Sequence, residues 1–389
     1  MRNYLIKDLM NVNRGSSPRP IMEYLSDSGY RWLKISDFNL YDRYVYETKE
    51  FIKEAGLKNT RHLPAGTLIL TNSATPGIPI FLGKDMCLHD GFLYFTNINE
   101  NIININFLYY WFLYNRNLII NQANGSVFKN LKKDIVENFE IKVPDINIQL
   151  KIIKILDNIN SKIELNNEII NNLYEMSLNI FNDFLNNNDA ELIKLEDCVE
   201  KINTGADAIQ RAPIVDYDTG FRCIRIGDMT NSRNYHNWGF TKMNDKDYDN
   251  YKLIKNDIVI TRTAVNGLTY MITDEERVVC NNGNIRLRVN NKYNPLYIYL
   301  NTKTKDFRDY IDRINGETSV RPNMKVEYFT SYKIKKYSLE EQDKICNVIK
   351  PLFNKINVNK KENYNLEQLR DTLLPKLMNG EINLDNIEI

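Results

Sequence analysis

The sequence predicts an α+β fold in which two strand-rich domains are each followed by one long helix. Three observations support this prediction. The chain has 389 residues, which is enough for two separate cores. Its second half repeats the first half in order, and each half ends in a heptad pattern of apolar residues. We therefore expect two copies of one domain-helix element related by an internal pseudo-two-fold axis.

The repeat consists of ordered matches at a nearly constant offset. Residues 5–15 (LIKDLMNVNRG) match residues 195–205 (LEDCVEKINTG) at an offset of 190 residues, and Gln149 matches Gln342 at an offset of 193. Between these matches, the segment LILTNSATPG corresponds to IVITRTAVNG. Chance does not explain so many matches in the same order, so we interpret the chain as a duplication.

Each domain contains short apolar runs such as LILT and IVIT, and loops rich in Gly, Pro, Asn and Ser separate these runs. Runs of this length between turn residues are typical of strands. We therefore place the first domain at residues 1–143 and the second at residues 189–337, with similar folds.

Two long helices are predicted at residues 144–188 and 338–379, followed by a C-terminal tail at 380–389. Apolar residues in both helices follow the four-three spacing of a coiled coil. The expected coiled-coil core residues are Ile152, Leu156, Ile159, Ile163, Asn166, Ile170, Leu173, Ile345, Ile349, Leu352, Ile356, Asn359, Asn363 and Leu366. The alternative is that each helix packs separately on its own domain.

The duplication also predicts how these helices pair. A two-fold axis perpendicular to the helices would make them antiparallel and place the two domains at opposite ends. Facing residues would then have numbers that sum to about 529, so Asn166 would face Asn363 and Leu173 would face Ile356. A polar pair at core positions costs stability but can fix the register.

Composition excludes several classes of protein. The 51 basic and 50 acidic residues nearly balance, which argues against a uniformly basic coat. No apolar run has the length of a membrane span, and the five scattered cysteines fit a reducing cytoplasm. Neither metal-ligand spacings nor phosphate-binding glycine loops are found, so we expect no metal, no cofactor and no catalytic residue on this chain.

One string resembles a catalytic motif. Asn294-Pro295-Leu296-Tyr297 is similar to the Asn-Pro-Pro-Tyr/Phe motif of adenine methyltransferases. The corresponding segment of the first half, Asn106-Phe107-Leu108-Tyr109, opens a helix and lacks the proline. An Asn N-cap followed by Pro at the first helical position explains the string as the start of a helix.

Taken together, these features resemble the specificity subunit of type I restriction-modification enzymes. The resemblance rests on the segments 5–15 and 195–205, on LILTNSATPG and IVITRTAVNG, and on the NG(x)SV segments with Val127 and Val320. The helix starts PDINIQL and YSLEEQD also resemble that family, where a Pro and a Glu-Gln pair are common. The first start lacks the Glu and the second lacks the Pro, which weakens this local match.

The resemblance implies a non-catalytic, cytoplasmic DNA reader. Two target-recognition domains would each read one half of a split double-stranded DNA site, and the paired helices would set their separation. Two methyltransferase subunits would bring S-adenosylmethionine, and restriction subunits would bring ATP and Mg. The rival hypotheses are a DNA methyltransferase or nuclease with its own active site, a coiled-coil scaffold that never binds DNA, and a reader subunit of a related phage-defence system.

The predicted DNA-binding residues are loop residues of types that contact bases or phosphates. Most of them occupy matched loops of the two halves, although any single one could be an ordinary solvated loop residue. In the first domain they are Arg14, Ser16, Ser17, Arg19, Lys34, Ser36, Asn72, Ser73, Thr75, Ser126 and Lys129. In the second domain they are Thr204, Gln210, Arg211, Arg225, Arg262, Thr263, Asn266, Thr318, Ser319, Arg321 and Lys325.

Overall fold

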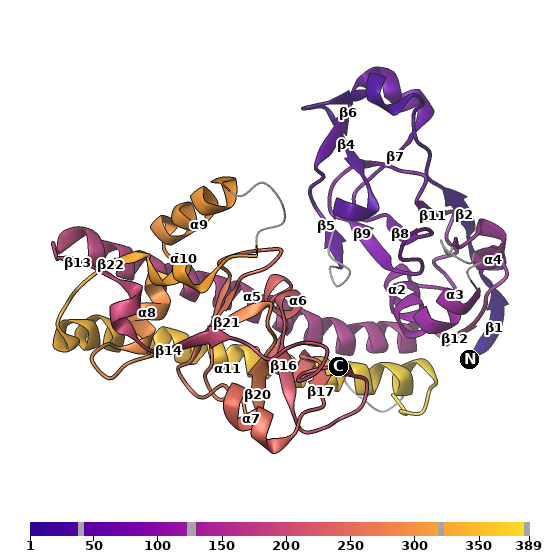
Figure 1. The fold of residues 1–389 in the computed structure, drawn as a ribbon. Helices are drawn as coiled ribbons and strands as arrows, with labels where there is room; N and C mark the ends of the chain where they lie inside the picture. The colour runs from indigo at the N-terminus through magenta and orange to yellow at the C-terminus, as the bar shows by residue number, and fades with distance from the viewer. Residues whose placement is uncertain (38–42, 123–129, 318–322, 385–389) are drawn as a thin grey trace. The chain divides into compact units, whose positions relative to one another are not determined.

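The computed structural model describes residues 1–37, 43–122, 130–317 and 323–384 (Figure 1). It divides into two compact units. Unit 1 comprises Met1–Ser161 and Leu366–Ile389, and unit 2 comprises Lys162–Asn365. Each unit thus contains one strand-rich region and parts of both long helices. The domain limits predicted from the sequence stay a prediction.

The described residues of unit 1 form three sheets. A pair joins β1 (Arg2–Leu5) to β12 (Glu140–Val143). One five-stranded sheet has the order β3 (Leu25–Ser26), β6 (Glu50–Ile52), β4 (Tyr30–Leu33), β10 (Met86–Leu88), β7 (Arg61–Leu63). The other has the order β2 (Asn11–Arg14), β11 (Phe92–Thr96), β8 (Leu68–Thr71), β9 (Pro79–Leu82), β5 (Tyr44–Val45). The short helices are α1 (Ile6–Leu9), α2 (Ile105–Tyr114), α3 (Arg116–Gln122) and α4 (Lys133–Glu137).

Unit 2 repeats this plan. A pair joins β13 (Leu192–Lys194) to β22 (Lys333–Lys335). The two four-stranded sheets have the orders β15 (Ile214–Val215), β17 (Phe240–Thr241), β16 (Arg222–Ile224), β20 (Val278–Cys280), and β14 (Val199–Thr204), β21 (Asn284–Val289), β18 (Ile258–Thr261), β19 (Thr269–Met271). The short helices are α6 (Ile226–Thr230), α7 (Asp245–Tyr251), α8 (Pro295–Asn301), α9 (Lys305–Glu317) and α10 (Val326–Thr330).

The strand orders of the two units are the same apart from two edge strands. Unit 1 adds β7 to one sheet and β5 to the other. Both units contain a parallel pair at the same place in the strand order, β4 with β10 and β16 with β20. The added strand β5 of unit 1 is also parallel to its neighbour β9. The predicted α+β fold with repeated strand-rich domains is therefore confirmed.

The match extends to a turn after the central strands β8 and β18. Ala74 and Ala264 adopt left-handed backbone conformations at equivalent places, with φ of 57° and 61°. Three residues further on, Gly77 and Gly267 have φ of 85° and 79°, a region that favours glycine. Their amides donate to the carbonyls of Thr71 and Thr261 at 2.8 and 2.9 Å. The two halves therefore share backbone geometry as well as topology.

The long helices are α5 (Ile146–Asn187) and α11 (Leu339–Met378). Buried glutamines join the start of each helix to its own domain. The Oε1 atom of Gln149 accepts from the Asn104 amide at 2.8 Å, and that of Gln342 accepts from the Asn294 amide at 2.9 Å. Both side chains are fully buried, so these bonds fix the helix starts.

The helices also contact each other. Within unit 2, Asn166 Nδ2 donates to Asn363 Oδ1 at 2.9 Å, and Lys162 pairs with Glu362 at 3.6 Å. Within unit 1, Arg370 donates to Asn160 at 3.3 Å. Further along α5 in unit 2, the Tyr174 ring packs against the Phe353 ring with centroids 6.3 Å apart. From the Asn166–Asn363 pair to this pair the residue numbers rise along α5 and fall along α11, so the helices are antiparallel. The hydrogen bond between Asn166 and Asn363 confirms that part of the predicted register.

Several predicted coiled-coil positions are buried, and these include Ile152, Leu156, Ile349 and Ile356. Others are only partly buried: Ile163, Ile170, Leu173, Ile345, Leu352 and Leu366. Ile152 and Leu156 belong to the core of unit 1. The helices therefore pack on their domains as well as on each other. None of the helices in the described residues is both long and apolar enough to span a membrane.

Candidate nucleic-acid interface

The candidate site begins where the chain leaves β2 in unit 1 and β14 in unit 2. We call residues 15–20 exit loop 1 and residues 205–212 exit loop 2. The Gly15 amide donates to Phe92 O at 2.9 Å, and the Gly205 amide donates to Asn284 O at 3.0 Å. A Cβ atom on either glycine would lie 2.2 Å from a backbone carbonyl oxygen. Only glycine fits this close approach, so both loops start in the same way.

Exit loop 1 borders a basic hollow of about 440 Å³ in unit 1. Its lining residues are Ser16, Ser17, Arg19, Lys58, Asn59 and Arg61. These residues supply three cations, two hydroxyls and one amide, and the lining includes no carboxylate. Such a set of donors suits a phosphate or the acceptor edge of a base.

Only Ser16, Ser17 and Arg19 of this lining were predicted from the sequence. Lys58 and Asn59 end the short 3-10 helix Glu54–Asn59, and Arg61 begins β7. The predicted residues mostly occupy positions shared by the two halves, whereas β7 has no counterpart among the strands that the described residues of unit 2 form. The signal that could have identified them is the string Lys58-Asn59-Thr60-Arg61, a dense run of DNA-contacting residue types.

Asp90 organises the side chains around the hollow. Its carboxylate accepts from Ser17 Oγ at 2.8 Å and lies 3.8 and 3.9 Å from the guanidinium groups of Arg14 and Arg19. Burial alone would raise the pKa of Asp90, but the Ser17 hydrogen bond and the nearby positive charges outweigh it and lower the pKa. Asp90 is therefore ionised and holds the two arginines near the loop.

A second pair of candidates follows β8 and β18, and the structure gives it a different role. Asn72 is only 2% exposed, and its Nδ2 donates to Asp90 O at 3.2 Å. Arg262, a predicted DNA-binding residue, follows β18 directly. It is half-buried, and its Nε donates to Met324 O at 3.0 Å. Both side chains bind backbone carbonyls in this structure because the chain turns back over them.

Other predicted residues also bond within their own unit. Lys34 pairs with Glu50 at 2.5 Å, Thr263 donates to Gly283 O, and Asn266 donates to Asn315 at 2.7 Å. Arg225 donates to the carbonyls of Cys223 and Phe240, and Arg211 donates to the Tyr251 hydroxyl. These bonds show which side chains would have to rearrange in order to contact DNA.

The remaining candidates differ in exposure. Ser36, Gln210 and Lys325 are exposed, whereas Ser73, Thr75 and Thr204 are partly buried. Some candidates lie outside the described residues: Ser126, Lys129, Thr318, Ser319 and Arg321, together with Val127 and Val320 of the NG(x)SV segments.

The Asn-Pro-Leu-Tyr string starts a helix. The Asn294 side chain accepts from the Leu296 amide as the N-cap of α8, with Pro295 at the first position. Tyr297 is buried, and its hydroxyl donates to Lys335 O at 2.6 Å. In unit 1 the cap is Asn104 rather than Asn106, because the Asn104 side chain accepts from the Asn106 amide. The string therefore belongs to the packing of the helix.

Metal and thiol chemistry receive no support from the described residues. They contain no cluster of His, Cys, Asp and Glu that could hold a metal ion. Burial raises the pKa of the Cys87, Cys198 and Cys346 thiols to about 12. These thiols therefore stay protonated at neutral pH and act as small core residues.

Comparisons with known proteins identify the family. The family model described as "Type I restriction modification DNA specificity domain" matches residues 1–175 and 187–368, so the chain belongs to this family. A type I restriction enzyme MjaIX specificity subunit from Methanocaldococcus jannaschii is 23% identical over 420 residues, which cover 98% of this chain and 93% of that protein.

The fold has a counterpart among solved structures. The crystal structure of a type I restriction-modification S subunit from M. genitalium aligns with a TM-score of 0.57 at 16% identity and covers 97% of this chain and 95% of that one. This likeness concerns the fold, and the family match supplies the function. The chain is a DNA-recognition subunit of the type I restriction-modification class, in which this subunit is not catalytic.

Proposed function

We propose that each unit reads one half of a split DNA target, with the exit loops at the centre of the two reading surfaces. The observation that carries this proposal is that two equivalent loop scaffolds bear different side chains. Exit loops 1 and 2 begin with the same glycine geometry, yet Arg19 occupies one loop where Ile209 occupies the other. Two loops with the same backbone start and different side chains suit a DNA target whose two halves differ in sequence.

In unit 1 the basic hollow is the proposed place for the DNA backbone. Arg19, Lys58 and Arg61 offer cations, and the Ser16 and Ser17 hydroxyls lie beside them. Contacts with phosphates position a protein on the duplex and make its affinity depend on salt. The net charge of the chain is only +1, so binding would depend on local patches of this kind.

The long helices are proposed to set the distance between the half-sites. α5 has 42 residues, which at a rise of 1.5 Å per residue gives roughly 60 Å. We propose that two methyltransferase subunits assemble with this chain and use S-adenosylmethionine, and that restriction subunits use ATP and Mg. These partners act on chromosomal DNA, which places the proposed complex in the cytoplasm.

Co-purification from the native host followed by methylome sequencing tests this proposal. We expect methyltransferase subunits to co-purify and one split motif to be methylated. Replacing residues 189–337 with those of a relative should then change one half of the motif and leave the other half and the spacing unchanged. A swap that alters both halves would refute independent reading. Partners without methyltransferase activity would instead favour a related defence system.

A further inference from the structure

The tips of the two exit loops differ in chemistry although their starts are equivalent. The Ser16 and Ala206 amides donate to Leu88 O and Cys280 O at 3.1 and 2.8 Å. Four residues after the loop glycine, unit 1 has Arg19 and unit 2 has Ile209. Each of these side chains is 83% exposed. The same place on the scaffold therefore presents a cation in one unit and an aliphatic group in the other.

Local hydrogen bonds hold Ile209 in its exposed position. Asp207 Oδ1 accepts from the amides of Ile209 and Gln210 at 3.0 and 2.8 Å, and Asp207 O accepts from Arg211 and Ala212 at 3.2 and 2.7 Å. The Asn282 amide, on the turn between β20 and β21, donates to Ala206 O at 2.8 Å. The turn is thus closed on itself and anchored to the sheet, so the exposure of Ile209 is part of the fold.

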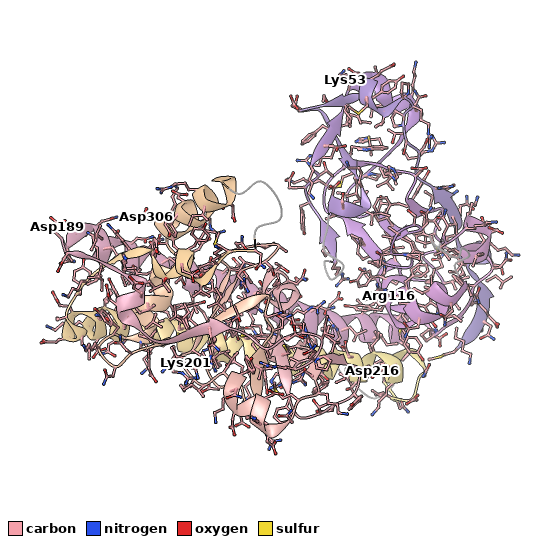
Figure 2. The ribbon with its side chains drawn as sticks, in the orientation of Figure 1. Lys53, Arg116, Asp189, Lys201, Asp216 and Asp306 are labelled. Atoms are coloured by element: carbon pink, nitrogen blue, oxygen red, sulfur yellow. The ribbon has the colours of Figure 1, made fainter. Side chains whose placement is uncertain are left out.

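Residues that can read bases follow Ile209 in the loop. Gln210 and Arg211 come directly after it and are both exposed, and Arg211 would have to leave its bond to the Tyr251 hydroxyl in order to contact a base. Glutamine pairs with adenine and arginine pairs with guanine in the major groove, where the one apolar group is the methyl group of thymine. Together with these two residues, Ile209 gives the loop one side chain for adenine, one for guanine and one for the methyl group of thymine. After the loop, the chain continues through β15 to Asp216, which is labelled in Figure 2.

We propose that Ile209 contacts the methyl group of a thymine in the major groove of the half-site that unit 2 reads. This inference rests on the proposed function and adds a specific base-reading contact to it. Ile209 covers apolar surface of the base, whereas Arg19 at the matching place of unit 1 can only donate hydrogen bonds. The thymine contact therefore belongs to one half of the target.

Uracil substitution tests the contact, because uracil differs from thymine only by this methyl group. The full chain, with the subunits that co-purify with it, is titrated with duplexes of the methylome-derived target. Each thymine of the half-site assigned to unit 2 by the domain swap is replaced in turn by uracil. Burial of one methyl group corresponds to an affinity difference of about fourfold. Uracil in place of the contacted thymine should therefore weaken the binding of the wild-type protein about fourfold, and uracil at the other positions should not.

The variant Ile209→Ala should bind the thymine duplex about fourfold more weakly and the uracil duplex as before, so the ratio of the two affinities falls to one. The matched control is Ile214→Ala, which removes another isoleucine of unit 2 that is 69% exposed. This control should keep the fourfold ratio. Replacing thymine by uracil in the other half-site should change the affinity of the wild type and of Ile209→Ala by the same factor.

A unit 2 half-site without an A·T pair would overturn the inference. A thymine-to-uracil ratio that Ile209→Ala leaves unchanged would also overturn it. If the affinity for both duplexes then falls equally, Ile209 inserts between bases or contacts a protein partner. If the wild type shows no sequence-specific, salt-dependent binding to any duplex, the proposed function itself fails. Specific binding with a wild-type ratio of one refutes only the Ile209 contact.

Discussion

The two units share their internal scaffold and differ at their edges and loop tips. Gln149 and Gln342 make equivalent bonds to Asn104 and Asn294, and the turns at Gly77 and Gly267 have nearly the same φ. The strands β5 and β7 of unit 1, in contrast, have no counterpart in the part of unit 2 that the structure describes. The shared features depend on bonds to backbone groups and on a few fixed glutamines and glycines, so most loop side chains are free to differ. A duplicated protein can therefore diversify its loops without losing its fold.

Removal of the buried glutamines tests whether the two scaffolds are equivalent. Gln149 bonds to Asn104, Ile102 and Pro144, and Gln342 bonds to Asn294 and Tyr337. Because these bonds are buried, Gln149→Ala or Gln342→Ala should each lower the free energy of unfolding of its unit by about 2 to 4 kcal/mol. Urea denaturation with hydrogen exchange resolved by unit would measure both losses.

Gln368→Ala is the control for this pair, since Gln368 is an exposed glutamine on α11. It should change stability by less than about 0.5 kcal/mol. A large loss at one buried glutamine and none at the other would contradict the equivalence of the two units.

The pH dependence of stability should distinguish the units. In unit 2, burial lowers the pKa of Lys303 from 10.5 to about 7, and the charges of Lys360 and Arg308 act in the same direction. Its Nζ donates to Thr269 O at 2.6 Å and lies 4.9 Å from the centre of the Tyr299 ring. Counted from the helix caps Asn104 and Asn294, the equivalent residue of unit 1 is Leu113.

The sign of this effect follows from proton binding. Between pH 7 and 10.5 the unfolded chain holds the Lys303 proton and the folded unit does not, so stability rises with pH in this window. From pH 7 to 9 the contribution should be about 1 to 2 kcal/mol. Lys303→Met should remove this rise, while Lys292→Met, at an exposed lysine, should retain it. Thermal denaturation across the pH range would show the difference, and equal slopes in both variants would refute it.

Two equivalent buried asparagines of the antiparallel helices differ in their hydrogen bonds. Asn166 and Asn359 occupy equivalent positions in the two halves, and both are 1% exposed. Asn166 bonds to Asn363 and Glu362, whereas neither amide atom of Asn359 has a hydrogen-bond partner among the described residues. Asn359→Leu should therefore stabilise unit 2 by about 1 kcal/mol. Asn166→Leu should destabilise it because Asn363 Oδ1 loses its donor, although Asn363 Nδ2 keeps its bond to Asn167.

Chemical denaturation of both variants would measure these opposite signs. Replacing Asn166 and Asn363 together with Ile should raise the melting temperature and make the spacing between half-sites less strict, if the pair fixes the register. Destabilisation by Asn359→Leu would show that this amide is satisfied in solution.

The smallest expected effect concerns the basic hollow of unit 1. Lys58→Ala should weaken binding to all duplexes about equally and reduce the salt slope of the binding constant by about one, as expected for one lost phosphate contact. The control is Lys53→Ala, because Lys53 immediately precedes the same 3-10 helix but does not line the hollow (Figure 2). A change in base preference for Lys58→Ala would instead indicate a base contact.

The sequence by itself determined the features that repeat or that have a short period. Gly15 and Gly205, Gln149 and Gln342, and the heptads of α5 and α11 were all visible as patterns. The glycines allow a close approach of two backbone segments, the glutamines make buried hydrogen bonds, and the heptads form apolar stripes. Each feature occurs once in each half of the chain. These features predicted the α+β fold, the antiparallel helices and the pairing of Asn166 with Asn363.

Only the tertiary structure decided where individual polar side chains point. It buried Asn72, turned Arg262 toward the Met324 carbonyl, and brought Lys58 and Arg61 to exit loop 1. It also left the amide atoms of Asn359 without a hydrogen-bond partner among the described residues, whereas the equivalent Asn166 bonds to Asn363. The physical reason is that the partners of these side chains come from segments distant in the chain. The type of a residue determines which hydrogen bonds its side chain can make. The packing of segments distant in the chain determines which of these bonds form.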